Sequence, residues 1–378
     1  MNNKENLFEE FPETNEKEWI EKVEKDLKGR SFKELFWSIN EDLNIAPFYY
    51  NNDQIPSVPA NKTKSNSWEI SEDVFVENPK SANQQLLNAL ANGVNAPRLI
   101  IDTSLDGTQM ATLFQHVELS YISIHFLLKS AKLAIEILEV FNNYLVKKNI
   151  NKNEIKGSIN HSDDDQLAEL IQFAIEKLPS FKTLTINIED SNPADISKSL
   201  AQSLVKGNDY LTLLYKKGIN PNTTNNHLQF SIPIGKSYFI EIAKIRALKI
   251  LWANILEVYG IKDSKIPAIE AHLSEASFGE DPNTNMIRAT TQAMSAALGG
   301  VNRLTVLPSD ANQGESTDFS RRIARNVQHL LMMESFFDRV IDPAKGSYYI
   351  EKLTEKIAEA AWSEFQKMEQ NSITENGK

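Results

Sequence analysis

Acidic and imidazole side chains recur where short apolar segments of this chain end. Placed at strand ends, such groups could act as general acids, general bases or ligands. The residues concerned are Asp102, His125, His161, Asp163, Glu189, Asp190, His272, Glu275 and Asp310. Taken singly, each is explained more simply as a loop residue or a helix cap.

The densest of these groups is His161 with the carboxylates of residues 163–165. It could be a metal cluster, but a hard cation needs ligands that converge from several loops. Carboxylates also favour the first turn of a helix, and the pattern from Asp165 to Leu178 is helical. We therefore expect a capped helix here and no metal site.

The elements that must position these side chains alternate along the chain. Helical spacing is clearest at 129–147 and 238–258, and it recurs at 319–336 and 349–369. Strand-like segments are expected at 68–76, 98–101, 119–127, 157–160, 184–188, 228–234, 268–273 and 304–307. Eight strand-then-helix units over about 270 residues match an α/β fold of the (β/α)8 TIM barrel type, whose active face lies at the carboxyl ends of the strands.

The first 50 residues differ from this pattern and predict a helical arm. Asn15 can cap a helix in which Trp19, Val23 and Leu27 share an apolar face. That face must be buried on the chain's own body or on a partner. We divide the chain into an arm for subunit association (1–50), a linker (51–67), a barrel (68–345) and a C-terminal helix and tail (346–378).

Composition excludes several functions. The chain has 378 residues, a formal charge of −11 and no cysteine. An acidic chain without basic runs is a poor nucleic-acid ligand, and no segment is apolar enough to cross a membrane. The absence of cysteine rules out disulfides and thiolate sites, and the N-terminus lacks a secretion signal. We expect a cytoplasmic protein that binds neither nucleic acid nor membrane.

Five strings resemble the substrate-domain barrel of the methylmalonyl-CoA mutases, the adenosylcobalamin-dependent isomerases that interconvert methylmalonyl-CoA and succinyl-CoA. They span almost the whole chain in family order. The strings are EWIEKVEKDLKG (18–29), IGKSYFIEIAKIRALKILWANI (234–255), EDPNTNMIRATTQAMSAALGG (280–300), TDFSRRIARNVQ (317–328) and IDPAKGSYYIEKLTEKIAEAAW (341–362). Amphipathic helices and caps would account for each string alone, but not for their order.

The resemblance also implies features that this sequence lacks. Catalytic chains of the family carry a C-terminal cobalamin-binding domain whose Asp-x-His-x-x-Gly motif presents a histidine to cobalt. None of the six histidines here has glycine three residues later, and the chain ends at Lys378. We expect that this domain is absent, that no residue of this chain binds the cofactor, and that a partner subunit holds adenosylcobalamin.

The fifth strand departs from the family as well. Catalytic chains have a Ser-Gly-Tyr-His-Met-like string there, whereas residues 185–193 read TINIEDSNP. A Tyr-Pro-Thr-Met-like segment is replaced by ENPK at 77–80. We expect no catalytic residue in this chain. By position alone, four residues remain candidates for contacts to a CoA thioester: His227, Gln229, His272 and Asn302.

The string TVLPSD at 305–310 resembles the small, or beta, subunit of the heterodimeric bacterial mutases. This resemblance implies a barrel that supports a catalytic large (alpha) subunit. Two alternatives stay open: the substrate-domain chain of a split mutase that binds a CoA thioester itself, and a homodimeric scaffold without enzymatic activity.

Overall fold

The computed structural model describes residues 15–40, 43–49, 58–59, 65–128, 131–161, 166–261 and 265–376. Its body contains two five-stranded sheets in which all neighbouring strands are parallel. One sheet has the order β3 (Glu69–Ser71), β12 (Arg303–Thr305), β11 (Ala268–Leu273), β10 (Leu228–Ile234), β9 (Leu184–Asn187). The other has the order β4 (Asp73–Phe75), β5 (Arg98–Ile101), β6 (Ser123–Leu128), β7 (Lys156–Asn160), β8 (Phe181–Lys182).

The two sheets are joined by continuous chain at both ends. A single residue, Glu72, separates β3 from β4, and Thr183 alone separates β8 from β9. Each strand segment expected from the sequence contains a strand. The first, 68–76, is divided between the sheets into β3 and β4, whereas β8 lies before the fifth segment, 184–188, and was not expected. The segment expected from residue 119 begins instead with a 3-10 turn, η2 (Leu119–Tyr121), and its strand starts at Ser123.

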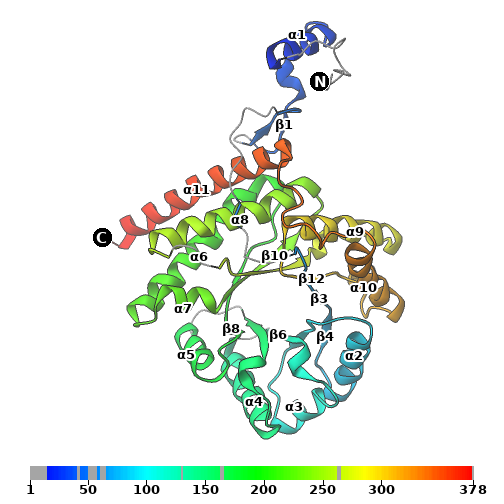
Figure 1. Cartoon of the computed structure of the whole chain (residues 1–378), viewed down its shortest axis with the longest axis vertical. Coiled ribbons are helices and arrows are strands. Elements are labelled where there is room, and N and C mark those ends of the chain that lie inside the picture. Colours follow the sequence, from blue (N-terminus) through cyan, green and yellow to red (C-terminus); the bar gives the residue numbers. More distant parts are fainter. Residues whose placement is uncertain are drawn as a thin grey trace, which may run out of the picture.

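Helices cover the outer face of each sheet (Figure 1). Beside β4 to β8 lie α2 (Pro79–Ala91), α3 (Gly107–Leu113), α4 (Ala134–Lys147) and α5 (Leu167–Lys177). Beside the other sheet lie α6 (Ile196–Lys216), α7 (Pro221–Asn226), α8 (Tyr238–Val258), α9 (Pro282–Gly299) and α10 (Asp318–Met333). Further 3-10 turns are η3 (Ala131–Leu133), η4 (Lys152–Glu154), η5 (Pro193–Asp195), η6 (Glu275–Ser277) and η7 (Ala311–Gln313). None of the described helices is long and apolar enough to span a bilayer.

Side-chain alternation along the strands explains where the cores lie. In β11, Ile269, Ala271 and Leu273 are buried in the core beneath the helices, whereas Glu270 and His272 point to the opposite side. Each sheet has its own main apolar cluster against its helices. The side that faces away from the helices is consequently lined by polar residues, and it is there that the functional candidates meet.

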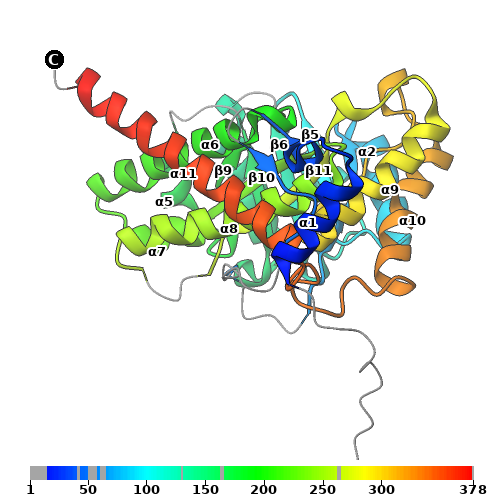
Figure 2. The same cartoon turned by 90° about the horizontal axis from the view of Figure 1, so that it is seen from above.

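The helix α11 (Tyr348–Asn376) runs across α6 and α8 on the outside of the body (Figure 2). It is fastened by Arg246 of α8, whose guanidinium bonds Asp342 and lies 2.5 Å from the Glu351 carboxylate. Arg246 is only 1% exposed. A buried cation with two carboxylate partners holds this helix in one position, because breaking such a pair leaves an uncompensated charge.

The N-terminal segment projects from the body beyond α11 (Figure 1). Its helix α1 (Glu16–Asp26) begins at the expected Asn15, which forms a capping box with Glu18. After η1 (Phe32–Leu35), the chain forms an antiparallel hairpin of β1 (Trp37–Ser38) and β2 (Asn44–Ile45). The expectation of an arm without sheet was therefore wrong. The reason is tertiary, since Leu43 and Ile45 of the hairpin are buried in the main core.

Candidate functional site

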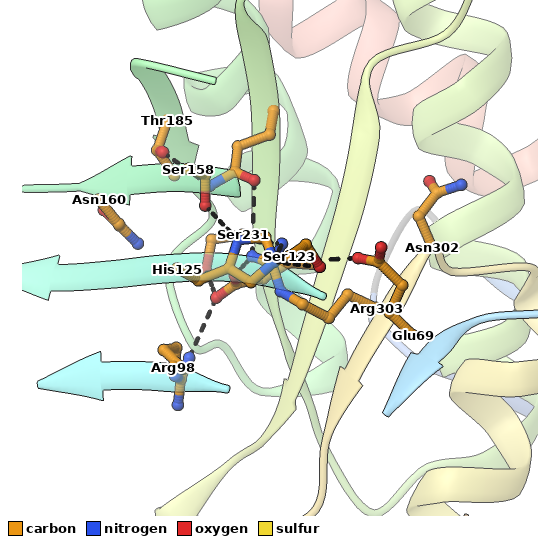
Figure 3. Close-up of polar contacts among 12 residues, drawn as sticks. Glu69, Arg98, Ser123, His125, Ser158, Asn160, Thr185, Ser231, Asn302 and Arg303 are labelled. Atoms are coloured by element: carbon orange, nitrogen blue, oxygen red, sulfur yellow. Dashed lines mark hydrogen bonds and ion pairs between the residues drawn. The ribbon is translucent and has the colours of Figure 1, made fainter. Parts of the chain in front are cut away.

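The side of the sheets that faces away from the helices contains a cluster of buried ionic side chains (Figure 3). Glu270 of β11 lies at its centre. Its Oε1 is 3.0 Å from Nη1 of Arg98, and its Oε2 accepts a hydrogen bond from Nη2 of Arg303. Arg98 also binds Asp73 through two hydrogen bonds, of 2.6 and 2.9 Å. Two buried arginines are thus neutralised by carboxylates on strands of both sheets.

Arg303, which binds Glu270, also contacts His125 of β6. Nη1 of Arg303 is 2.7 Å from Nδ1 and 3.0 Å from Nε2 of the imidazole. Because a guanidinium only donates hydrogen bonds, the ring must accept with an unprotonated nitrogen. Burial, followed by the positive charges of Arg303 and Arg98, holds the pKa of His125 well below its usual value. This histidine is neutral and is a poor candidate for a general acid.

Small polar residues fill the space around these charges. Ser158 and Ser123 lie 2.7 and 3.1 Å from the two nitrogens of His125. Ser231 donates to Glu270 over 3.1 Å. Thr185 donates to the Ile159 carbonyl and accepts from Gln229, each at 3.0 Å. These four small polar residues therefore belong to a hydrogen-bonded interior.

Burial shapes the electrostatics of the cluster. Burial lowers the pKa of Arg303 to about 9, although Glu69 raises it, and Arg303 remains protonated at neutral pH. Burial also acts on Arg98, but Asp73 outweighs it and the pKa of Arg98 is raised. The cluster consequently holds fixed, paired charges near neutral pH. Because Arg303 stays protonated and His125 stays neutral, these two groups are suited to positioning other groups rather than to transferring protons.

The four predicted substrate contacts do not form one cluster. His227 and Asn302 directly precede β10 and β12, at the amino ends of the strands, whereas His272 lies near the carboxyl end of β11. Nδ1 of His227 is 2.8 Å from the Phe181 carbonyl, and Oδ1 of Asn302 accepts from the Ile269 amide at 2.8 Å. These two side chains bind backbone. Their role in substrate binding stays a prediction.

Gln229 belongs to the ionic cluster, where its Oε1 is 3.5 Å from Nη2 of Arg303. In the strand register it pairs with Ala268, four residues before His272. Four residues of β-strand span about 13 Å. One substrate group cannot therefore contact both Gln229 and His272.

Several other strand-end candidates have structural partners. Asp190 accepts a hydrogen bond from Ser274. Asp310 accepts from Thr317 and Ser320 at the start of α10; burial acts to raise its pKa, but these hydrogen bonds outweigh it and the pKa is lowered. The aspartate at 163 lies outside the described residues. Within the described part of the chain, no three histidine or acidic side chains converge as metal ligands would.

The sequence interpretation missed the residues that carry the cluster: Arg98, Glu270 and Arg303. A signal was present, because a charged residue stands in the middle of the apolar segment AIEAHL at 268–273. Arg98 and Arg303 are each the first residue of a strand. At such a position the sequence is equally consistent with a loop. Only the strand register shows that they share an interior.

Comparison with known proteins places this architecture in context. The family profile of methylmalonyl-CoA mutase matches residues 145–372. The methylmalonyl-CoA mutase small subunit of Porphyromonas gingivalis is 34% identical over 400 residues, which cover 97% of this chain and 64% of that protein. The large subunit of the same organism is 30% identical over 278 residues, covering 67% of this chain and 38% of that protein.

Among solved structures, a dihydropteroate synthase from Stenotrophomonas maltophilia aligns with a TM-score of 0.42 and 11% identity. The alignment covers 71% of this chain and 94% of that one. The chain spans less than two thirds of the length of the Porphyromonas gingivalis small subunit.

Proposed function

Because the chain belongs to the methylmalonyl-CoA mutase family, we propose that it is the small (beta) subunit of a heterodimeric mutase that interconverts methylmalonyl-CoA and succinyl-CoA. In this proposal the chain does not catalyse. It supports a large (alpha) subunit that binds substrate and adenosylcobalamin. The similarity to a small subunit along 97% of the chain supports this assignment.

We further propose that the two sheets form one (β/α)8 barrel. β3 and β4 belong to different sheets with only Glu72 between them, and so do β8 and β9 with only Thr183 between them. The amide of Arg98 also donates to the carbonyl of Glu72, at the point where the first segment passes between sheets. This continuity supports a circular strand order.

The ionic cluster is the observation that carries the supporting role. Arg98, Glu270 and Arg303 occupy the interior at 7%, 2% and 4% exposure, and each is bonded to groups on other strands. A thioester chain that passed between these strands would have to separate buried ion pairs, which costs several kcal/mol for each ion left without a partner. The interior therefore favours a fixed core over a substrate channel.

The fifth strand and the histidines agree with this role. Residues 185–193 contain no imidazole that could contact a substrate carbonyl. His125 and His227 are buried and hydrogen-bonded within the sheets, so they do not fit an axial ligand to cobalt. Adenosylcobalamin, which the family implies, would supply radical chemistry in the assembled enzyme and would be held by the partner.

The decisive experiment is a mutase assay with methylmalonyl-CoA and adenosylcobalamin. This chain, the large subunit from the same source, and their mixture are assayed separately, and the mass of any complex is measured. We expect a 1:1 complex, and turnover only where the large subunit is present. Turnover by this chain alone would reject the non-catalytic role, and failure to form a complex would reject the subunit assignment.

A further inference from the structure

A cavity of about 70 Å³ lies at the amino ends of the strands. Its lining includes Pro267 and Asn302, which precede β11 and β12, and the glycines at 299 and 300, where α9 ends. Lys249, Asn302 and Asp342 line it and are partly exposed, so the cavity is accessible from solvent. A single water needs about 10–15 Å³ measured in this way, so the cavity has room for a molecule of about five non-hydrogen atoms.

The ammonium of Lys249 is the charged donor of this cavity. It donates to the carbonyls of Gly299 and Gly300, at 2.8 and 2.7 Å. Gly300 leaves room for it, because a Cβ at that position would lie 2.7 Å from Nζ. Among the residues that the structure describes, Nζ has no third hydrogen-bond partner and no carboxylate within ion-pair distance. An ammonium has three donors, so one remains for a molecule in the cavity.

The charges around the cavity favour an anion. The other cation in its wall, Arg246, is already bonded to Asp342 and Glu351. Burial lowers the pKa of Lys249 to about 8, although Asp342 acts to raise it. The positive charge of Lys249 is therefore only partly compensated, and a buried charge is stabilised by a partner of opposite sign. Asp342 and the carboxyl end of α9 are both negative, so a second negative charge on the ligand is disfavoured.

Asn302 supplies a second donor, and the remaining walls are largely apolar. Oδ1 of Asn302 accepts from the Ile269 amide at 2.8 Å, which fixes the orientation of the side-chain amide and leaves Nδ2 as a donor. Ile266, Pro267 and Val301 add apolar surface to the same cavity. An ammonium and an amide can bind the oxygens of one carboxylate, while apolar walls can hold a short carbon chain.

We propose that this cavity binds a short-chain monocarboxylate of two or three carbons, with Lys249 and Asn302 as the donors to its carboxylate. A three-carbon carboxylate has about five non-hydrogen atoms, which is the size that the cavity admits. The site lies outside the buried cluster around Glu270, so it requires no passage between the strands. It is also independent of the subunit assignment.

The test uses the full chain alone, with propionate as the probe. Saturation-transfer NMR on the propionate methyl group measures the affinity, in a buffer free of other carboxylates. Propionamide, which has the same shape without the charge, and succinate, which is longer and doubly charged, should bind at least about tenfold more weakly. A second readout is Cε of Lys249 in the chain labelled with 13C-lysine. Saturating propionate should raise the pKa of Lys249 above about 8, because anion binding and protonation favour each other.

Asn302→Asp keeps the acceptor for the Ile269 amide but replaces the donor with a negative charge, and it should weaken propionate binding at least about tenfold. Lys249→Met identifies the Lys249 resonance and provides a second variant, which should lose binding. Asn222→Asp, at an exposed position of α7, is the matched control and should bind as the wild type does.

Binding that does not saturate would show that the cavity holds only water and would overturn the proposal. Equal binding of propionamide or succinate, an unchanged pKa of Lys249 with propionate, or wild-type affinity in Asn302→Asp or Lys249→Met would overturn it as well.

Discussion

At the scale of single residues, Glu270 decides how the interior is held together. It is 2% exposed and bonds two arginines that come from different sheets. Burying charges is costly, and the attraction offsets that cost only when every charge keeps its partners. Removing Glu270 alone should therefore lower the free energy of unfolding by much more than the net amount that the whole cluster contributes to it.

We predict that Glu270→Leu lowers the free energy of unfolding by about 3–5 kcal/mol, because Arg303 loses its carboxylate acceptor while it stays buried. Urea denaturation of the isolated chain measures this change. The matched control is the triple variant Arg98→Met, Glu270→Leu, Arg303→Met, which should regain most of the loss. A single variant as stable as the wild type would show that the cluster is not buried as described.

At the scale of elements, Lys249 joins the helices α8 and α9. It lies on α8, and its ammonium is 2.8 and 2.7 Å from the carbonyls of Gly299 and Gly300, where α9 ends. Such a contact satisfies carbonyls that have no partner within their own helix. Lys249 also lines a cavity of about 70 Å³, together with Asn302 and Asp342. Burial lowers the pKa of Lys249 to about 8.

This pKa predicts a stability change with a definite sign. Between pH 8 and about 10.4 the unfolded chain binds more protons at Lys249 than the folded chain does, so stability rises with pH in this interval. Relative to Lys249→Met, the wild type should gain on the order of 1–3 kcal/mol from pH 7.5 to pH 10. Urea midpoints at several pH values measure it. Lys216→Met, at an exposed position of α6, should track the wild type, and parallel curves for wild type and Lys249→Met would refute the assignment.

At the scale of the whole molecule, the exposed aromatic side chains of the projecting arm are the feature that a partner protein covering them would explain. Trp19 packs on Phe32 and Phe48, with ring centroids 5.7 and 5.1 Å away, but no residue of α1 is buried. Phe48 and Trp37 remain 49% and 45% exposed. Aromatic groups of this kind are typical anchors of protein interfaces.

We predict that Trp19→Ser with Leu27→Ser weakens association with the large subunit at least about tenfold, because a truncated interface anchor typically costs more than 1 kcal/mol. Titration calorimetry measures the affinity, and circular dichroism verifies that the body stays folded. Val23→Ser tests the same face independently. Tyr215→Ser, an exposed aromatic on α6, is the control and should bind normally. Unchanged affinity in the arm variants would exclude the arm from the interface.

Local patterns in the sequence were enough to predict the elements. The segments at 98–101, 228–234 and 268–273 are strands with those bounds, and 238–258 is a helix with those bounds. Their periodicity depends on neighbours a few residues apart, which the sequence contains. The motifs likewise identified the family that the profile confirms. The hairpin at Trp37–Ile45 was not predictable in this way, because Leu43 and Ile45 obtain their burial from distant parts of the chain.

The interior was decided by tertiary structure alone. Arg98, Glu270 and Arg303 are up to 205 positions apart (303 − 98), and nothing local to any of them indicates a partner. The strand register brings them together and separates His227 and Asn302 from His272, although the sequence named all three, together with Gln229, as candidates for substrate contacts. Ion pairing and shared burial depend on distance in space, and only the folded chain fixes that distance.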